Sequence, residues 1–119
     1  MLELKNISKA YDNNGQKVEA IKSLDLKLEE REFIAMVGPS GCGKSTFLKI
    51  IAGLVQASGG EVMLDGKKIT KPGKDRGMVF QSFTLFPWLT VRENIGFGLD
   101  LQKISSKKKG EVVNHYLEV

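Results

Sequence analysis

Cysteine, proline and long apolar runs are all scarce in this sequence of 119 residues. The single cysteine, Cys42, argues against a disulfide framework and favours a reducing, cytosolic setting. With only 3 prolines and 27% charged residues, the chain is neither fibrous nor disordered in composition. The longest apolar runs, such as residues 33–37, are far below the roughly 18 residues that span a bilayer. The length therefore allows one globular domain or part of one.

Charge of one sign is also only modestly in excess, with a net charge of +4. A pI near 9.2 raises nucleic acid or anionic lipid as partners, but much of the excess lies in the lysines of residues 107–109. We interpret this cluster as a solvated face. A nucleic-acid-binding module is the alternative, and because no aromatic residues interleave with these lysines we expect no nucleic-acid partner.

The first half of the chain predicts an antiparallel β layer followed by a strand and a helix. Leucines alternate with charged residues in segments 2–4 and 24–28, which lie on either side of a turn sequence at 12–15. Residues 33–37 are apolar without alternation, which predicts a strand buried on both faces. After Lys44, apolar residues recur at three- and four-residue spacing as far as Val55, which is typical of an amphipathic helix.

The second half predicts a hairpin, a short strand and two helices. Asp65-Gly66 is a two-residue turn signal between segments 61–64 and 68–70, and residues 77–80 predict another short strand. Thr90-Val91-Arg92-Glu93 has the spacing of a capping box, so we expect a helix over 91–101. A second helix is expected after the lysines. Because no glycine or proline ends it, we expect the protein to continue beyond this sequence.

One motif carries chemistry: Gly38-Pro39-Ser40-Gly41-Cys42-Gly43-Lys44-Ser45 matches Gly-x-x-x-x-Gly-Lys-Ser between a predicted strand and a predicted helix. Glycines let backbone N–H groups wrap a phosphate, and the helix N-terminus adds partial positive charge. Lys44 would reach the β- and γ-phosphates, and the Ser45 hydroxyl would bind Mg²⁺. A glycine-rich turn that binds no ligand is the alternative. The residues expected to contact the nucleotide here are Gly38, Ser40, Gly41, Cys42, Gly43, Lys44, Ser45 and Thr46.

The order of Tyr11, the loop at 38–46, Asp65-Gly66 and Met78-Val79-Phe80-Gln81 resembles the N-terminal half of an ABC transporter ATPase subunit. The resemblance covers essentially the whole chain. Segments 72–81 and 85–94 are similar to importers of nitrate, aliphatic sulfonates or taurine. The resemblance implies an α/β fold with an incomplete P-loop NTPase core. The N-terminal antiparallel β layer and that core would occupy 1–81, and the start of a helical subdomain 82–119.

The same resemblance assigns further site residues. Tyr11 would stack on adenine with Val18 beside it, although packing of Tyr11 on the core is the alternative. Gln81 would be the Q-loop residue, touching Mg²⁺ or the attacking water, so that Lys44 and Gln81 form the catalytic pair. Residues 83–88 would begin the helical subdomain, where Phe86 and Trp88 meet a coupling helix of the membrane subunit or pack in a core.

Two segments resemble later ABC motifs but are better explained locally. Val62-Met63-Leu64-Asp65 ends in an aspartate as a Mg²⁺-binding strand does, yet Gly66 follows it, so we interpret it as a hairpin turn. Ser58-Gly59-Gly60-Glu61 links the loop helix to the next strand, where glycine ends the helix, and we reject it as a signature motif.

Several motifs of a full family member do not occur in this sequence: the signature, the strand ending in Asp-Glu, and the switch histidine. His115, the only histidine, lies on the predicted last helix and is expected at the surface. We therefore expect this chain to bind ATP but scarcely hydrolyse it, and to expose the edge of strand 33–37, which makes it marginally stable. The alternatives are a truncated, non-catalytic remnant and another P-loop protein, such as a GTPase, whose guanine motif is absent.

The resemblance also implies partners and a location. The partners would be transmembrane permease subunits, a second ATP-binding subunit and, indirectly, a solute-binding protein. The chain would be cytoplasmic, peripheral on the inner face of the cell membrane.

Overall fold

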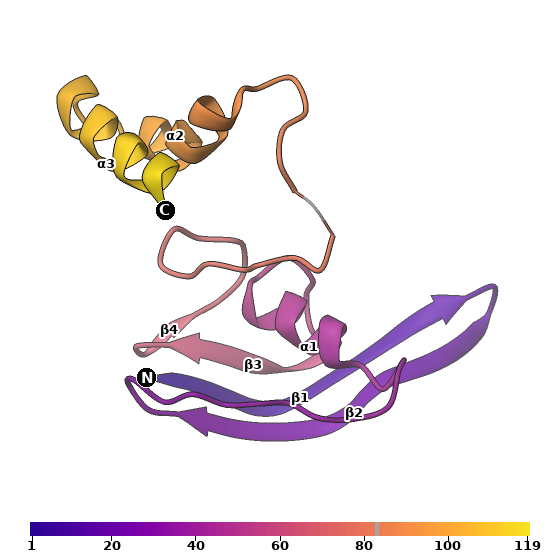
Figure 1. The fold of residues 1–119 in the computed structure, drawn as a ribbon. Helices are drawn as coiled ribbons and strands as arrows, with labels where there is room; N and C mark the ends of the chain where they lie inside the picture. Colours follow the sequence, from indigo (N-terminus) through magenta and orange to yellow (C-terminus); the bar gives the residue numbers. More distant parts are fainter. Residues whose placement is uncertain (83) are drawn as a thin grey trace. The chain divides into compact units, whose positions relative to one another are not determined.

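The computed structural model describes residues 1–82 and 84–119, which divide into two compact units, Met1–Val79 and Phe80–Val119 (Figure 1). The first unit is an antiparallel sheet with a helix on one face, and the second is a pair of helices. No helix among these residues is long and apolar enough to cross a membrane. The elements of the first unit are β1 (Leu2–Asn13), β2 (Gln16–Leu28), α1 (Lys44–Ile51), β3 (Gly59–Leu64) and β4 (Lys67–Lys68), and those of the second are α2 (Val91–Leu101) and α3 (Ser106–Glu118).

Two tight turns set the order of the sheet, β2-β1-β3-β4, in which all neighbours are antiparallel. The β1–β2 turn places Asn14 and Gly15 at positive φ, and the Gly15 N–H donates to Asp12 Oδ1 at 2.8 Å. Asp65 and Gly66 do the same between β3 and β4. Both predicted hairpins are confirmed, and 62–65 is a hairpin arm rather than a metal-binding strand. The second arm is shorter than predicted because β4 contains only two residues.

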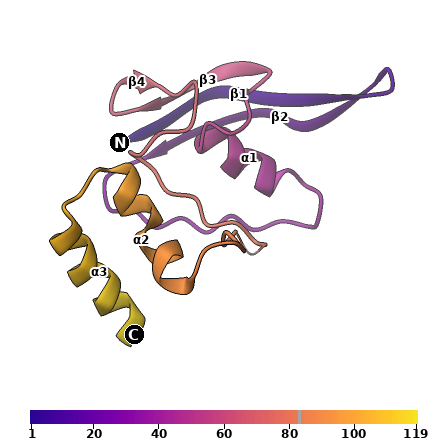
Figure 2. The same ribbon diagram turned by 90° about the horizontal axis from the view of Figure 1, so that it is seen from above.

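Helix α1 lies on one face of the sheet and closes a small core (Figure 2). The strand alternation turns alternate side chains toward the helix, where each fully buried one contributes roughly 1.5–3 kcal/mol. The helix prediction reached too far, since α1 ends at Ile51 and Gly53 follows at a φ of 75°. It is this glycine, and not those at 59 and 60, that ends the helix. The core residues are Leu4, Ile7, Phe47, Ile50 and Val62.

Two predicted strands, 33–37 and 77–80, are wrong. Within residues 1–82 and 84–119 no strand pairs with either segment, and a strand forms only beside a hydrogen-bonded neighbour. Phe33 and Val37 are consequently 94% and 93% exposed, although the apolar run predicts burial. The exposed apolar segment that we expected is therefore present, but as irregular backbone.

The second unit begins its first helix at the predicted position. Thr90 caps α2 with a complete capping box, in which the Glu93 N–H donates to Thr90 Oγ1 and the Thr90 N–H donates to Glu93 Oε2 at 2.7 Å. The Thr90 N–H and the Thr90 hydroxyl both donate to the Glu93 carboxylate, and these two bonds lower the pKa of that carboxyl. Helix α3 packs on α2 through Gly96 and the half-buried Lys109, whose ammonium donates to Asp100 at 2.6 Å. Because α3 begins at Ser106, the lysines lie in its first turn and not before it.

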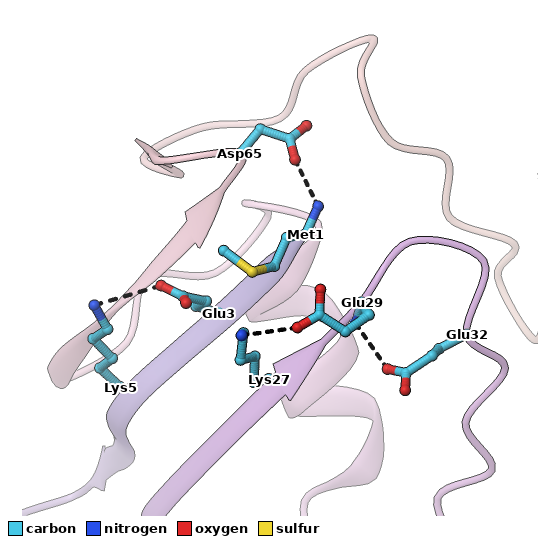
Figure 3. Close-up of polar contacts among 7 residues, drawn as sticks. All are labelled: Met1, Glu3, Lys5, Lys27, Glu29, Glu32 and Asp65. Atoms are coloured by element: carbon cyan, nitrogen blue, oxygen red, sulfur yellow. Dashed lines mark hydrogen bonds and ion pairs between the residues drawn. The ribbon is translucent and has the colours of Figure 1, made fainter.

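The amino terminus is bound to the turn between β3 and β4 (Figure 3). The Met1 ammonium donates to Asp65 Oδ1 at 2.6 Å, and the Asp65 N–H donates to the Met1 carbonyl at 2.9 Å. This contact raises the pKa of the terminal amine above its ordinary value. Nearby, Lys27 pairs with Glu29 at 2.8 Å, which raises the pKa of the lysine and lowers that of the glutamate.

The terminal ion pair predicts a pH dependence of stability. An amine whose pKa is higher in the folded chain stabilises it below about pH 8, and this contribution is lost as the pH rises through the folded pKa. We expect the melting temperature of the wild-type chain to fall between pH 8 and pH 10 by more than that of Asp65→Asn, because asparagine suits the positive φ of residue 65 but carries no charge. Thermal melts at low salt measure the difference. Parallel curves for the two chains would contradict the prediction.

Candidate functional site

The loop at 38–45 leads directly into the N-terminus of α1. Gly41 and Gly43 have φ angles of 79° and 95°, a region that other residues rarely adopt. Gly43 is the N-cap of the helix, and its carbonyl accepts the Phe47 N–H at 2.8 Å. The first N–H groups of α1 have no partner within the helix and point toward the loop side, which favours an anion there.

Gly43 also lets the loop rest against strand β2. A Cβ atom at this position would lie 2.5 Å from the Ala20 carbonyl oxygen, closer than any side chain tolerates. A cavity of about 330 Å³ lies beside this contact, between the loop and β2, and Met36, Cys42 and Phe47 line part of it. The glycine is therefore required by both the backbone angle and the close approach.

The Lys44 ammonium folds back over its own loop. It donates to the carbonyl oxygens of Gly38 and Pro39, each at 2.7 Å, and lies 3.5 Å from the Cys42 sulfur. Two neutral carbonyls satisfy a cation less well than an anionic oxygen does, because charge-assisted hydrogen bonds are about twice as strong. The loop thus holds a positive charge beside free helix N–H groups. The next residue, Ser45, is exposed.

The first hairpin brings Tyr11, Val18 and Thr46 together. Tyr11 pairs with Val18 across β1 and β2, and its hydroxyl donates to Thr46 Oγ1 at 3.5 Å. Tyr11 is 41% exposed, so it is not packed in the core as the alternative interpretation required, and Val18 beside it is also exposed. Their register follows from the turn at Asn14 and Gly15.

Lys9 is a neighbour of this aromatic ring that the sequence interpretation missed. Its ammonium lies 4.9 Å from the centre of the Tyr11 ring and donates to the Gln56 carbonyl at 2.9 Å. Such a cation polarises the ring and fixes its orientation. The signal in the sequence was the two-residue spacing of Lys9 and Tyr11 on one strand, which places both on the same face.

Gln81, the remaining predicted site residue, lies in the second unit, where it is exposed. The first unit alone carries the others. Of the predicted start of the helical subdomain, residue 83 lies outside the described residues. The centre of the Phe86 ring lies 4.5 Å from that of Phe97 and 5.4 Å from that of Trp88, so Phe86 belongs to a small aromatic cluster while Trp88 stays exposed.

Comparison with known proteins shows which family this sequence belongs to. Residues 21–118 match the family described as ABC transporter. The chain belongs to the ABC transporter family. Over 118 residues it is 44% identical to the ABC transporter ATP-binding protein MJ0412 of Methanocaldococcus jannaschii, and equally to the nitrate import ATP-binding protein NrtD of Synechocystis sp.. Each alignment covers 99% of this chain and 44% of the relative, so the chain spans less than half of these relatives' length.

Solved structures of this family share the fold. The ATP-binding cassette MJ0796, solved as a dimer in a post-hydrolysis state bound to ADP and Pi, superposes with a TM-score of 0.86 at 34% sequence identity. The match covers 99% of this chain and 56% of that one. The resemblance stated from the motifs and the predicted fold class, a P-loop ABC ATPase core with an antiparallel β layer, are both confirmed.

Proposed function

We propose that this chain binds ATP through the loop at 38–46, as the ATP-binding part of an ABC-type importer. The observation that carries the proposal is the Lys44 ammonium, which is held over the loop by two carbonyls at 2.7 Å beside the N-terminus of α1. An arriving phosphate would accept from this ammonium in place of the carbonyls. The two family relatives described above are ATP-binding proteins by name, which supports the proposal.

The polyphosphate would be bound mainly by backbone. We assign the N–H groups of Gly38, Ser40, Gly41, Cys42 and Gly43 to the phosphates, with Lys44 on the β- and γ-phosphates and Thr46 near the α-phosphate. Backbone donors suit this task because they are already oriented by the two positive-φ glycines. The exposed side chain of Cys42 fills the loop rather than acting as a nucleophile.

Magnesium fits this site only together with the nucleotide. The part of the chain that the structure describes has no group of three or more His, Cys, Asp or Glu side chains that could hold a metal ion by itself. The hydroxyl of the exposed residue Ser45 is one hard oxygen ligand, and the phosphates would supply others. We also assign Gln81 to the metal, as the resemblance implies. Bound Mg²⁺ would neutralise part of the phosphate charge.

The adenine would stack on the exposed face of Tyr11, with Val18 beside it. The contact between the Tyr11 hydroxyl and Thr46 ties this ring to the end of the phosphate loop, which supports a shared ligand. The Lys9 ammonium contacts the Tyr11 ring and helps to hold its orientation. An aromatic face accepts any purine, so the ring gives affinity more than discrimination.

Hydrolysis in this family would need groups that these 119 residues do not include. Lys44 and Gln81 are our candidates for the catalytic pair, but the signature, the Asp-Glu strand and the switch histidine do not occur in these 119 residues. We therefore propose that the chain binds ATP and turns it over slowly at most. In the importer, the proposed partners are a second ATP-binding subunit, permease subunits and, indirectly, a solute-binding protein.

The remaining proposals concern substrate, place and organisation. The name of the relative NrtD supports a nitrate-like solute, with sulfonate or taurine as the related choices. The proposed location is cytoplasmic, on the inner face of the membrane. Residues 1–81 would form the β layer and P-loop core of the ATP-binding domain, and 82–119 the Q-loop and the start of the helical subdomain.

A titration with Mg-ATP tests the central proposal. We expect saturable binding with one site per chain by equilibrium dialysis, and competition by ADP. Preferential displacement by GTP would support the GTPase alternative instead. Absence of binding by a chain with a folded circular dichroism spectrum would support the non-catalytic remnant and overturn the proposal.

A further inference from the structure

The loop at 71–76 is closed by one half-buried arginine. Arg76 is 15% exposed, and its Nη2 donates to the Lys71 carbonyl at 2.5 Å while its Nη1 pairs with Asp75 at 2.9 Å. Its Nε is buried and has no hydrogen-bond acceptor among the residues that the structure describes. Burying part of a charged guanidinium costs free energy. Closing a short loop does not by itself require a residue with this cost.

The carbonyl that Arg76 binds also contacts the end of the phosphate-loop helix. A Cβ atom on Gly53, two residues after α1, would lie only 2.5 Å from the Lys71 oxygen. The Lys71 carbonyl is therefore held between Gly53 and Arg76. In this way the arginine fastens the loop to the C-terminal end of the helix whose N-terminal end carries Lys44.

The contact between Arg76 and the Lys71 carbonyl lies shortly before Gln81 in the sequence. The first unit ends at Val79, three residues after Arg76, and Gln81 follows two residues later in the second unit. We propose that Arg76 is a positioning residue for Gln81: it fixes, against the end of α1, the point from which the chain runs to Gln81. This inference rests on the proposed function, since Gln81 acts only if ATP binds.

A movement of the end of α1 on nucleotide binding would reach Arg76, from which the chain runs on to Gln81. Gly53 follows two residues after α1 and lies against the Lys71 carbonyl, and Arg76 binds that carbonyl within one short loop. Coupling of this kind has to be measured, because contact alone does not show it. The only tryptophan, Trp88, lies seven residues after Gln81 with its side chain exposed, and its fluorescence is a reporter for this part of the chain.

The experiment separates ATP affinity from the response of Trp88. The full chain is compared with Arg76→Gln, Arg76→Lys and the matched control Lys74→Gln, which removes one charge from an exposed position in the same loop. Equilibrium dialysis gives the affinity for Mg-ATP, and tryptophan emission at saturating Mg-ATP gives the response. We expect affinities within about twofold of the wild type, because the hydrogen bonds of Arg76 go to Asp75 and Lys71 and not to the phosphate loop. The Trp88 response should decrease from wild type to Arg76→Lys to Arg76→Gln and remain intact in Lys74→Gln.

A loop that is merely structural would change stability without this ordered loss of response. An Arg76→Gln chain that binds ATP and responds as the wild type does would overturn the proposal, as would a wild type that binds ATP with no change in Trp88. If Arg76→Gln does not fold, Arg76→Lys decides, because it keeps the charge but loses the forked donor. Failure of the wild type to bind ATP in the dialysis is instead the failure of the proposed function.

Discussion

Replacing Lys44 by alanine is expected to weaken the binding of Mg-ATP by roughly 10- to 100-fold, which corresponds to one lost hydrogen-bond contact between charged groups. The ammonium now spans the loop between the carbonyls of Gly38 and Pro39, within reach of any anion at the N-terminus of α1. Alanine removes the charge and leaves the backbone N–H groups, so weak binding should remain. Equilibrium dialysis with labelled ATP gives the two dissociation constants.

The matched control for this variant is Lys49→Ala. Lys49 lies on the same helix, exposed and in its last turn, where a cation favours the helix but cannot reach the loop. We expect its ATP affinity to stay within about twofold of the wild type. Thermal melts of both variants show whether the loss of the loop contacts destabilises the fold. Equal affinity in Lys44→Ala and the wild type would contradict the assignment of Lys44 to the phosphates.

The parts of the fold that were predictable from the sequence are those set by neighbouring residues. The hairpin turns at Asn14-Gly15 and Asp65-Gly66 need positive φ, and the capping box at Thr90 needs only a glutamate three residues later. The two strand predictions that failed, 33–37 and 77–80, depend on a distant partner strand. An apolar sequence indicates that a segment can be buried, but it does not show whether a partner strand is present to form hydrogen bonds with it.

The candidate site divides in the same way. The phosphate loop is continuous in sequence, and its glycines predict the positive φ angles that the structure shows. The proximity of Tyr11 to Thr46 was implied only by resemblance, because it needs the hairpin to fold over the start of α1. Arg76 entered the sequence interpretation only as part of segment 72–81, with no role of its own. Its importance depends on the approach of Gly53 to the Lys71 carbonyl, and nothing in the local sequence indicates that contact.

Substitution of Gly43 by alanine is expected to produce the largest loss of stability in the loop, about 2–5 kcal/mol. Two costs add at this position. The φ of 95° is unfavourable for any side chain, and the new Cβ atom would lie 2.5 Å from the Ala20 carbonyl oxygen of β2. Relief requires the loop to move away from β2, and this shifts the first turn of α1. We therefore expect ATP binding to be lost together with stability.

Gly41→Ala is the control that separates these two costs. Gly41 has a similar φ of 79°, but a Cβ atom there would have no atom within 4 Å. The backbone angle alone should cost roughly 1–2 kcal/mol. Urea unfolding of the two variants gives the difference, which measures the contact with Ala20. Equal destabilisation would mean that the loop can move off β2 at no cost, and then the close approach of Gly43 to this strand would not be what holds the phosphate loop in place.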